Sequence, residues 1–329
     1  MVELGFEDLA KYPILKEVEA YFRERKISLE ELSLDDYRPV LERARERIFE
    51  AVERAKVSYK RGCPDLEIMS FLVAFLLVRA SGSEFLMQKY SLSEARRVEE
   101  LLQGEKSDGV FSYVVKALGI DAVALEDGTF ELDFDRYLRL ATRLHSDRWK
   151  LVNRELSKGS VRIPRRDLVR LVREAVRDLI YERLRKAPAP KVPESVKGIV
   201  EELKAISPKP VRRPKAQGGA YPPCVAHALE MLSKGENVPH IGRFLLVSYL
   251  YNKGVGIEDI ISLFSTSPDF NERVTRYQVE HIAGIRGGGK KYLPPSCRIL
   301  QSKGFCFKTE ECDGIKNPLQ FRGRKVERG

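Results

Sequence analysis

Long apolar runs are missing from this chain of 329 residues. The longest one, over residues 68–78, reads IMSFLVAFLLV. A membrane-spanning helix needs roughly 18 to 20 apolar residues, so this run predicts a buried helix and no membrane partner. Residues 1–25 also lack an apolar segment followed by a small-residue cleavage site. We therefore expect no secretory signal and a cytoplasmic location.

Asn and Gln are scarce as well, with 11 among the 329 residues, whereas charged residues make up 32%. This composition is typical of thermophile proteins. Hydrophobic residues reach 43%, which is too apolar for a disordered chain. At roughly 100 to 200 residues per domain, the length predicts about two folded domains.

The positive charge is unevenly distributed along the chain. Residues 208–329 contain 20 Lys and Arg against 11 Asp and Glu, a net charge of +9, whereas residues 1–207 contain 38 against 37. A basic domain attracts polyanions, and nucleic acid is the first candidate. A basic surface that is merely solvated is the alternative. We expect solvation for the basic residues of the linker and the tail, namely Arg212, Arg213, Lys215, Arg322, Arg324, Lys325 and Arg328.

Apolar residues at helical spacing dominate the first part of the chain. Residues 16–25, 37–59 and 65–80 show this pattern. Ser91 and Glu94 fit a capping box, which predicts that the next helix begins near residue 91 and continues to residue 103. The N-terminal region is therefore expected to be a bundle or stack of helices.

A short interruption follows at residues 119–135, where the dipeptide Asp127-Gly128 lies between alternating residues. This pattern predicts a β-hairpin. Helices are expected again over 136–157 and 165–186. The predicted fold class is mainly α, with a small β-hairpin insertion in a helical N-terminal domain and a mostly helical, loop-rich domain after it.

Two proline-rich segments suggest where the domains divide. Residues 186–193 read KAPAPKVP, which cannot continue a helix and predicts a semi-extended hinge. A short helix is expected from Ser195 to Ile206, before a second break over 207–223. We predict one domain over residues 1–187, a linker over 188–210 and a basic domain over 211–329.

Four of the five cysteines lie in the basic domain: Cys224, Cys297, Cys306 and Cys312. Their spacing lacks the paired C-x2-C knuckles of most structural zinc sites, so zinc is not favoured. One distant and three neighbouring thiolates suit a 4Fe-4S cluster, which needs one cysteine for each iron. Two disulfides or unrelated buried thiols are the alternatives. Cys63 is expected to be a core or helix-entry residue without chemistry.

Several longer motifs make the sequence similar to a known family, the large subunit of the archaeal and eukaryotic DNA primase. The basic domain contains YPPCVAHALEMLSKGENVPHIGRFLLVSYLYNKGVGIEDIISLF, then YQVEHIAG, KKYLPPSC and GFCF. The N-terminal region contributes CPDLEIMSFLVAFLLV, KYSLSEA and RWKLVNRELSKGSV. The resemblance covers nearly the whole chain. It implies that Cys224, Cys297, Cys306 and Cys312 hold one 4Fe-4S cluster.

The resemblance also implies a function. The chain would be the noncatalytic, regulatory subunit of a primase that makes short RNA primers for DNA replication. Its N-terminal domain would dock the catalytic small subunit in a heterodimer, and the iron-sulfur domain would bind template DNA, RNA primer and the initiating NTP. Some archaeal lineages add a further small subunit. No catalytic residue is expected on this chain, because the polymerising carboxylates of the family lie on the small subunit.

The HIGR segment offers a site for an anion. Pro239 is expected at the first position of a helix over 240–252, so the free N–H groups and the positive end of the helix dipole would lie at this segment. By resemblance, His240 and Arg243 hold the 5′-triphosphate of the initiating nucleotide. Just before HIGR, where some relatives carry His and Arg, this chain has Asn237 and Pro239. Glu280 replaces a basic residue of the corresponding eukaryotic motif. These three positions are therefore not carried over as anion contacts.

Template and primer contacts are expected from two further segments. By resemblance, Tyr277 and His281 face the template and primer. A Gly-rich loop over 286–292 lets the backbone approach phosphates, while its cations neutralise them and its aromatic residue stacks on a base. The loop residues assigned this role are Arg286, Lys290, Lys291 and Tyr292.

Asp133-Phe134-Asp135 resembles a metal-binding pair of carboxylates, but we expect Asp135 to cap the following helix instead. Two other functions fit parts of the sequence. An iron-sulfur nuclease would need Asp, Glu and Lys clustered on a central sheet. A zinc-stabilised or metal-free nucleic-acid adaptor would differ in its metal content.

Overall fold

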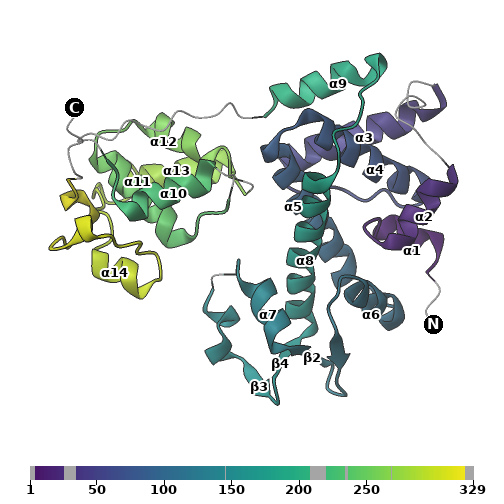
Figure 1. The fold of residues 1–329 in the computed structure, drawn as a ribbon, viewed down its shortest axis with the longest axis horizontal. Helices are drawn as coiled ribbons and strands as arrows, with labels where there is room; N and C mark the ends of the chain where they lie inside the picture. The colour runs from purple at the N-terminus through teal and green to yellow at the C-terminus, as the bar shows by residue number, and fades with distance from the viewer. Residues whose placement is uncertain are drawn as a thin grey trace. The chain divides into compact units, whose positions relative to one another are not determined.

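The computed structural model describes residues 4–25, 35–144, 146–207, 220–233, 236–267 and 269–322, with the side chains of residues 22–25 and 35 not described. The chain forms two compact units, residues 1–207 and 208–329. Each unit has its own hydrophobic core and is described by itself (Figure 1).

The first unit is mainly helical, as predicted. Its helices are α1 (Phe6–Lys11), α2 (Lys16–Arg25), α3 (Arg38–Glu53), α4 (Pro64–Ser81), α5 (Glu84–Gln103), α6 (Asp108–Ala117), α7 (Phe134–Ala141), α8 (Arg165–Lys186) and α9 (Glu194–Ala205). Three short 3-10 turns accompany them: η2 (Asp35–Tyr37), η3 (Asp147–Trp149) and η4 (Leu151–Asn153). No helix in the described ranges is long and apolar enough to cross a membrane.

Helix α4 contains the apolar run and is buried, as predicted. Pro64 occupies its first turn, where the missing N–H costs nothing, and Gly82 ends it in the left-handed conformation. Helix α5 packs along α8, so the long helices surround a common core (Figure 1).

An ionic network of three arginines and two glutamates is buried between α3, α4 and α5. The Arg47 guanidinium donates to both carboxylate oxygens of Glu94 at 3.0 Å and to Glu67 at 2.9 Å. Arg43 donates to Glu67 and Arg97 donates to Glu94, each at 2.9 Å. These five side chains are at most 1% exposed, so none of their charges is screened by water.

The prediction that a helix begins near residue 91 is wrong. Helix α5 begins at Glu84, because the Ser83 hydroxyl accepts from the Leu86 N–H at 3.3 Å and caps the helix there. Ser91 lies in the middle of the helix and donates to the Met87 carbonyl at 2.6 Å. Glu94, the second half of the supposed capping box, belongs to the ionic network.

A four-stranded antiparallel sheet with the order β1-β2-β4-β3 lies at one end of the unit. Its strands are β1 (Ala122–Ala124), β2 (Thr129–Asp133), β3 (Glu155–Ser157) and β4 (Ser160–Pro164). The hairpin predicted at residues 119–135 is confirmed as β1 and β2. The helix predicted over 136–157 is only partly right, because α7 ends at Ala141 and the chain then enters a second hairpin.

The second hairpin turns at Lys158-Gly159, and both residues have positive φ, which is the geometry of a two-residue turn that matches strand twist. Asp133, not Asp135, caps α7, because its carboxylate accepts from the Asp135 and Arg136 N–H groups at 3.0 and 3.2 Å. Asp135 forms an ion pair with Arg139 at 2.7 Å, so both carboxylates have local structural partners.

The helix that we assigned to the linker belongs to the first unit. Val196, Val200 and Leu203 of α9 are buried in the core of that unit, and α9 packs against α4. The chain therefore divides after Ser207 rather than at the proline-rich segment over 186–193. The apolar spacing of α9 explains this, since the helix has a face to bury.

The second unit is helical and rich in loops. Its elements are α10 (Pro223–Ser233), α11 (His240–Asn252), α12 (Ile257–Phe264), α13 (Glu272–Ala283), α14 (Cys297–Ser302), η5 (Glu310–Cys312) and η6 (Pro318–Gln320). Helix α11 packs against α10, α12 and α13, and its buried leucines Leu245, Leu246 and Leu250 form the centre of the core.

Candidate metal centre and ligand pocket

The four cysteines of the second unit come together around one cavity. Cys224 lies in the first turn of α10, Cys297 begins α14, Cys306 lies in the loop after α14, and Cys312 ends η5. All four line a cavity of about 120 Å³. All five cysteines of the chain are described and none forms a disulfide, so the paired-disulfide alternative does not fit the structure.

Local hydrogen bonds hold this loop-rich segment in place. The Ser296 hydroxyl caps α14, and the Cys297 N–H donates to the Lys316 carbonyl at 2.9 Å. The Asn317 amide donates to the Pro294 carbonyl at 2.9 Å. The segment after Cys312 is thus tied back to the start of α14, which brings Cys297 and Cys312 to the same cavity.

The donor set of this cavity consists of four thiols. Within the described ranges, no three His, Cys, Asp or Glu side chains have the arrangement that holds one metal ion. Four thiolates are the donors that a 4Fe-4S cluster requires, one for each iron. Burial, and then the neighbouring thiols Cys297 and Cys306, raise the pKa of Cys224 to about 12. Such crowded thiols lose their protons when metal binds.

Cys63 takes no part in this cavity. It is exposed in the first unit and immediately precedes α4 as its N-cap residue. The helix-entry role predicted for it is the one observed, and the core role is not.

A second cavity, of about 320 Å³, is lined by residues of α11, α12 and α13 and contains most of the predicted nucleotide contacts. Its volume is within the range of small-molecule sites. The predicted residues that line it are His240, Arg243, Tyr277, His281 and Tyr292. Phe244, Val247, Phe264, Thr275, Gln278, Val279 and Ile282 complete the wall.

The first turn of α11 provides the positive end of a helix dipole at this pocket. Pro239 is the N-cap residue rather than the first helical residue, one position earlier than predicted, and α11 begins at His240. Among the described residues of α11's first turn there is no acidic side chain. The turn therefore favours an anion, and His240 and Arg243 lie on it.

Arg243 is held by three partners that the sequence did not reveal. Its Nε donates to the Val238 carbonyl at 2.7 Å, and its Nη2 donates to both carboxylate oxygens of Asp269 at 2.7 Å. Nη2 also donates to the Asn237 side-chain oxygen. Asp269 lies 26 residues further along the chain, in the segment between α12 and α13, so no helical or strand spacing links it to Arg243.

Aromatic rings form a continuous series along the pocket. His281 stacks between Tyr277 and Tyr292, with ring centroids 6.2 and 5.6 Å apart and interplanar angles of 28° and 27°. Phe244 packs edge-on against Tyr292 at 5.9 Å. The Tyr277 side chain is 55% exposed and that of Tyr292 is 38% exposed. Both rings therefore present surface on which a base can stack.

The glycine-rich loop returns to α13 but does not line the pocket, except at Tyr292. Gly284 ends α13 with φ of +79°, and a Cβ there would lie 2.7 Å from the Lys290 carbonyl carbon, so only glycine allows this approach. Arg286 forms an ion pair with Glu280 and lies over the Tyr277 ring. Lys291 lies over the Tyr251 ring at 4.7 Å.

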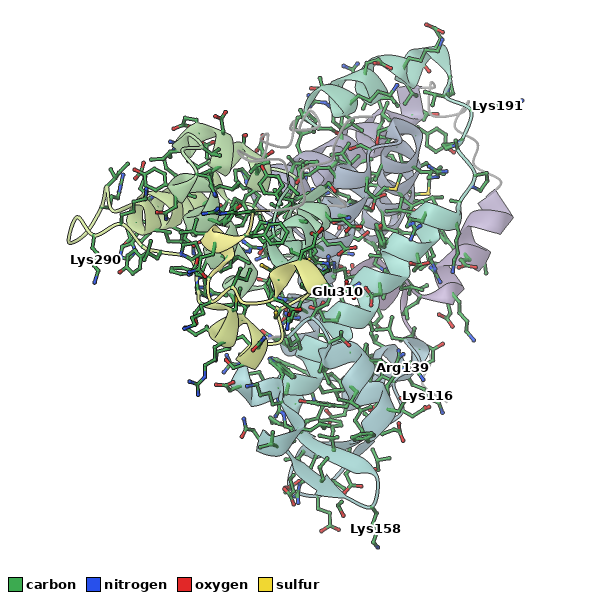
Figure 2. All side chains as sticks on the ribbon, turned by 60° about the vertical axis from the view of Figure 1, so that its left-hand side comes forward. Lys116, Arg139, Lys158, Lys191, Lys290 and Glu310 are labelled. Atoms are coloured by element: carbon green, nitrogen blue, oxygen red, sulfur yellow. The ribbon has the colours of Figure 1, made fainter. Side chains whose placement is uncertain are left out.

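Lys290 is exposed at the outer end of the loop (Figure 2). Glu280 stands where the resemblance would place a basic residue. In this chain its carboxylate is the ion-pair partner of Arg286. The predicted template residues thus divide into two groups. Tyr277, His281 and Tyr292 form the wall of the pocket, whereas Arg286, Lys290 and Lys291 belong to the loop beside it.

Most of the basic residues predicted to be solvated are not described by the structure. Arg212, Arg213 and Lys215 of the linker and Arg324, Lys325 and Arg328 of the tail lie outside the described residues, and Arg322 is exposed. An iron-sulfur nuclease would need its acidic and lysine residues on a sheet. The one Glu-Leu-Lys sequence near the basic domain, residues Glu202 to Lys204, lies in helix α9 instead.

Comparisons with known proteins agree with the resemblance in the sequence. Residues 215–327 match the family described as the C-terminal domain of the eukaryotic and archaeal DNA primase large subunit. The chain is similar over its whole length to the DNA primase large subunit PriL of Methanocella arvoryzae, with 34% identity over 90% of that protein. The PriL of Methanosarcina mazei is 33% identical over 97% of this chain and 89% of the relative. That of Archaeoglobus fulgidus is 31% identical over 83% and 70%.

Proposed function

The chain belongs to the family of eukaryotic and archaeal DNA primase large subunits, and we propose from this that it is a noncatalytic subunit that helps to start a primer. Its second unit would hold template DNA and the 5′-triphosphate of the initiating nucleotide, while the active site lies on a small subunit. The pocket at the start of α11 carries this proposal, because it combines a helix N-terminus, Arg243 and a series of exposed rings.

In this proposal the triphosphate binds at the first turn of α11. The orphan N–H groups of the turn and the Arg243 guanidinium donate to the phosphate oxygens, and His240 supplies a further donor from the same turn. The triphosphate displaces the Asp269 carboxylate from Arg243, because both are anions and both use the same guanidinium edge. Tyr277 and Tyr292 stack on bases of the initiating nucleotide or the template.

Holding the initiating nucleotide beside the template lowers the entropic barrier to the first phosphodiester bond. Without such binding, two nucleotides must meet in solution in the correct orientation. Holding both of them in place raises their effective concentration, so that the first bond forms without this encounter. The chain contributes binding and orientation to this step. The proton transfers and metal ions of phosphoryl transfer belong to the small subunit.

Cys224, Cys297, Cys306 and Cys312 are proposed to hold one 4Fe-4S cluster in the cavity of about 120 Å³ that they line. When bound, the cluster supplies four metal–thiolate bonds that tie the loops after α14 to α10. Phe305 directly precedes Cys306 and packs against Gly242 in the first turn of α11. A loop held by the cluster would therefore also hold the first turn of α11 in place at the pocket. A Cβ on Gly242 would lie 2.6 Å from the Phe305 ring.

The first unit is proposed to dock the small subunit through exposed apolar residues near the sheet. Phe134 and Leu138 lie on one side of α7, Val152 lies in η4 and Leu156 lies in β3, with exposed fractions from 39% to 85%. The Phe134 N–H donates to the Gly159 carbonyl at 3.0 Å, which places α7 against the β3–β4 turn. Exposed apolar side chains of this size are typical of protein interfaces.

Metal analysis tests the cluster directly. Protein purified without oxygen is measured for iron, acid-labile sulfide, zinc and visible absorption. About four irons per chain are expected, one for each thiolate. The Cys297→Ser variant should lose the absorption and primer initiation but keep binding to the small subunit, whereas Cys63→Ser should keep all three. Zinc in place of iron would support an adaptor instead, and normal priming by an iron-free variant would contradict the cluster's role.

Primer initiation tests the pocket. Arg243→Ala should reduce formation of the first dinucleotide by the reconstituted complex while leaving extension of a preformed primer unchanged. Arg276→Ala is the matched control, because Arg276 binds the exposed Glu258 outside the pocket. Equal loss of initiation and extension in Arg243→Ala would contradict the proposal, since that result indicates a general folding defect.

A further inference from the structure

A groove in the first unit has an apolar floor and a positively charged rim. Its volume is about 600 Å³, and it lies between α6, α8 and the segment that precedes α2. Its lining residues are Ile14, Leu15, Lys16, Tyr113, Lys116, Ala117, Leu118, Arg136, Ala175, Leu179 and Arg183. Lys116 lies on the surface at the end of α6 (Figure 2). No part of the proposed function uses this groove.

The floor consists of aliphatic side chains. Leu118 and Leu179 are partly buried and pack against the core of the unit, whereas Ile14 and Leu15 are only 2% exposed and lie at the base. The floor therefore offers apolar surface to a ligand without exposing the core itself.

The rim contains four cations and, among the residues that the structure describes, no lining carboxylate. Arg136 donates to the Leu118 carbonyl at 2.9 Å, and Arg183 donates to the Ile14 carbonyl at 3.2 Å. These bonds fix both guanidinium groups at the groove. Lys16 and Lys116 are exposed and have no ion-pair partner within the described ranges.

Two acidic side chains of α2 contact residues that line the groove. Glu17 accepts a hydrogen bond from the Tyr113 hydroxyl, and Glu19 lies 3.4 Å from Arg183. Even with both counted, the four cations exceed the carboxylates at the groove. This excess is local, because the first unit as a whole is nearly neutral, with 38 Lys and Arg against 37 Asp and Glu in residues 1–207.

We propose that this groove binds an acidic, amphipathic peptide segment of a partner protein. Apolar side chains of the segment would occupy the floor over Leu118 and Leu179, and its carboxylates would pair with Lys16 and Lys116. A nucleic-acid backbone matches the cations but not the aliphatic floor. The groove also lacks an exposed aromatic series of the kind seen in the second unit, so a single strand has little on which to stack.

Peptide binding to the full chain tests this proposal. The probe is a fluorescein-labelled helical peptide of about 14 residues with leucines at i, i+3, i+4 and i+7 and glutamates elsewhere. Matched peptides replace every Glu by Lys, or every Leu by Ala. We expect binding by the acidic leucine peptide alone, weakened about tenfold by the double variant Lys16→Glu, Lys116→Glu. Lys191→Glu is the control, because this exposed lysine lies away from the groove (Figure 2).

Zero-length crosslinking with a carbodiimide locates the contact, since it joins a lysine amine to a carboxylate. Crosslinks from the acidic peptide are expected at Lys16 and Lys116 and not at Lys191. Equal binding of the acidic and basic peptides, or crosslinks spread evenly over surface lysines, would overturn the proposal. The proposal would also be overturned if a single-stranded oligonucleotide displaced the peptide from the wild-type chain and bound the double variant more weakly.

Discussion

Arg243, which lines the pocket, is paired with Asp269, and Nη2 of the arginine lies 2.7 Å from both carboxylate oxygens of the aspartate. The side chains are 23% and 30% exposed, so water screens the pair only partly. A carboxylate here occupies the same guanidinium edge that a phosphate would use. Asp269 is therefore an internal competitor for the anion that we propose for this pocket.

Replacing the competitor should strengthen triphosphate binding. Asp269→Asn keeps the shape and one acceptor but removes the negative charge. We expect the Kd for ATP, measured by titration calorimetry on the full chain, to fall about fivefold. Glu258→Gln removes an equivalent charge from the ion pair with Arg276 outside the pocket and should leave the Kd unchanged. Weaker binding in Asp269→Asn would show that Asp269 positions Arg243 rather than competing with the ligand.

Sequence reasoning grouped the residues that line this pocket better than it found their partners. His240 and Arg243 lie one helical turn apart, and Tyr277 and His281 share a face of α13, so local spacing was sufficient to group each pair. The pairing of Arg243 with Asp269 depends on how the segment after α12 packs. No periodic pattern connects residues 26 positions apart in a loop, and for that reason the sequence could not reveal it.

Gly242 should be sensitive to substitution, because side chains pack closely against it. Gly242 lies within α11, so replacing it by alanine would raise the free energy of unfolding by about 0.5 to 1 kcal/mol if there were room for the Cβ. A Cβ would instead lie 2.6 Å from Phe305 and 2.8 Å from Val238. We expect Gly242→Ala to destabilise the second unit by about 1 to 3 kcal/mol and to hasten iron loss.

Chemical unfolding followed by circular dichroism measures this change, and iron retention follows it independently. Gly198→Ala is the matched control. Gly198 lies in α9, and apart from its own neighbours and the backbone of that helix no described atom lies within 4 Å of the position that a Cβ would take, so alanine should stabilise the first unit. A Gly242→Ala protein as stable as wild type would mean that Phe305 moves away at little cost.

The fold was predictable where a segment's own pattern determined its structure. The apolar run gave α4 and the Asp127-Gly128 turn gave the first hairpin. The second hairpin was missed, because its first strand, β3, lies within residues 136–157, which were assigned to a helix. Glu94 was misassigned for a different reason. Its partner Arg97 lies three residues further along the same helix, whereas Arg47 reaches it from α3 through tertiary packing, which a capping pattern does not include.

Glu94 should make the first unit sensitive to acid. Desolvation would raise the pKa of its carboxyl, but Arg47 and Arg97 outweigh this effect and hold the pKa below its ordinary value of 4.5. A lowered folded-state pKa contributes stability above the unfolded-state value and loses it as the pH falls through the folded-state value. Glu94→Gln should therefore cost about 3 kcal/mol at pH 7, and the difference from wild type should shrink below about pH 4.5.

Trp149 provides the measurement, because it is the single tryptophan of the chain and lies 8% exposed in the first unit. Its fluorescence during urea unfolding reports on that unit alone. Glu100→Gln is the control, since Glu100 pairs with Lys56 at the surface and should change stability by less than about 1 kcal/mol. A difference between Glu94→Gln and wild type that stays constant from pH 7 to pH 3 would contradict the assignment.

The apolar residues around α7 should determine affinity for the small subunit without supporting the fold. Phe134 and Leu138 are 40% and 39% exposed, so replacing either by Glu costs the isolated chain little. An interface that buries them would instead have to desolvate a carboxylate, which weakens binding by about 2 kcal/mol or more. We therefore expect Leu138→Glu to weaken the complex at least about tenfold in analytical ultracentrifugation. Val123→Glu, on the opposite edge strand β1, is the control, and equal weakening by both variants would show that the partner covers the sheet rather than α7.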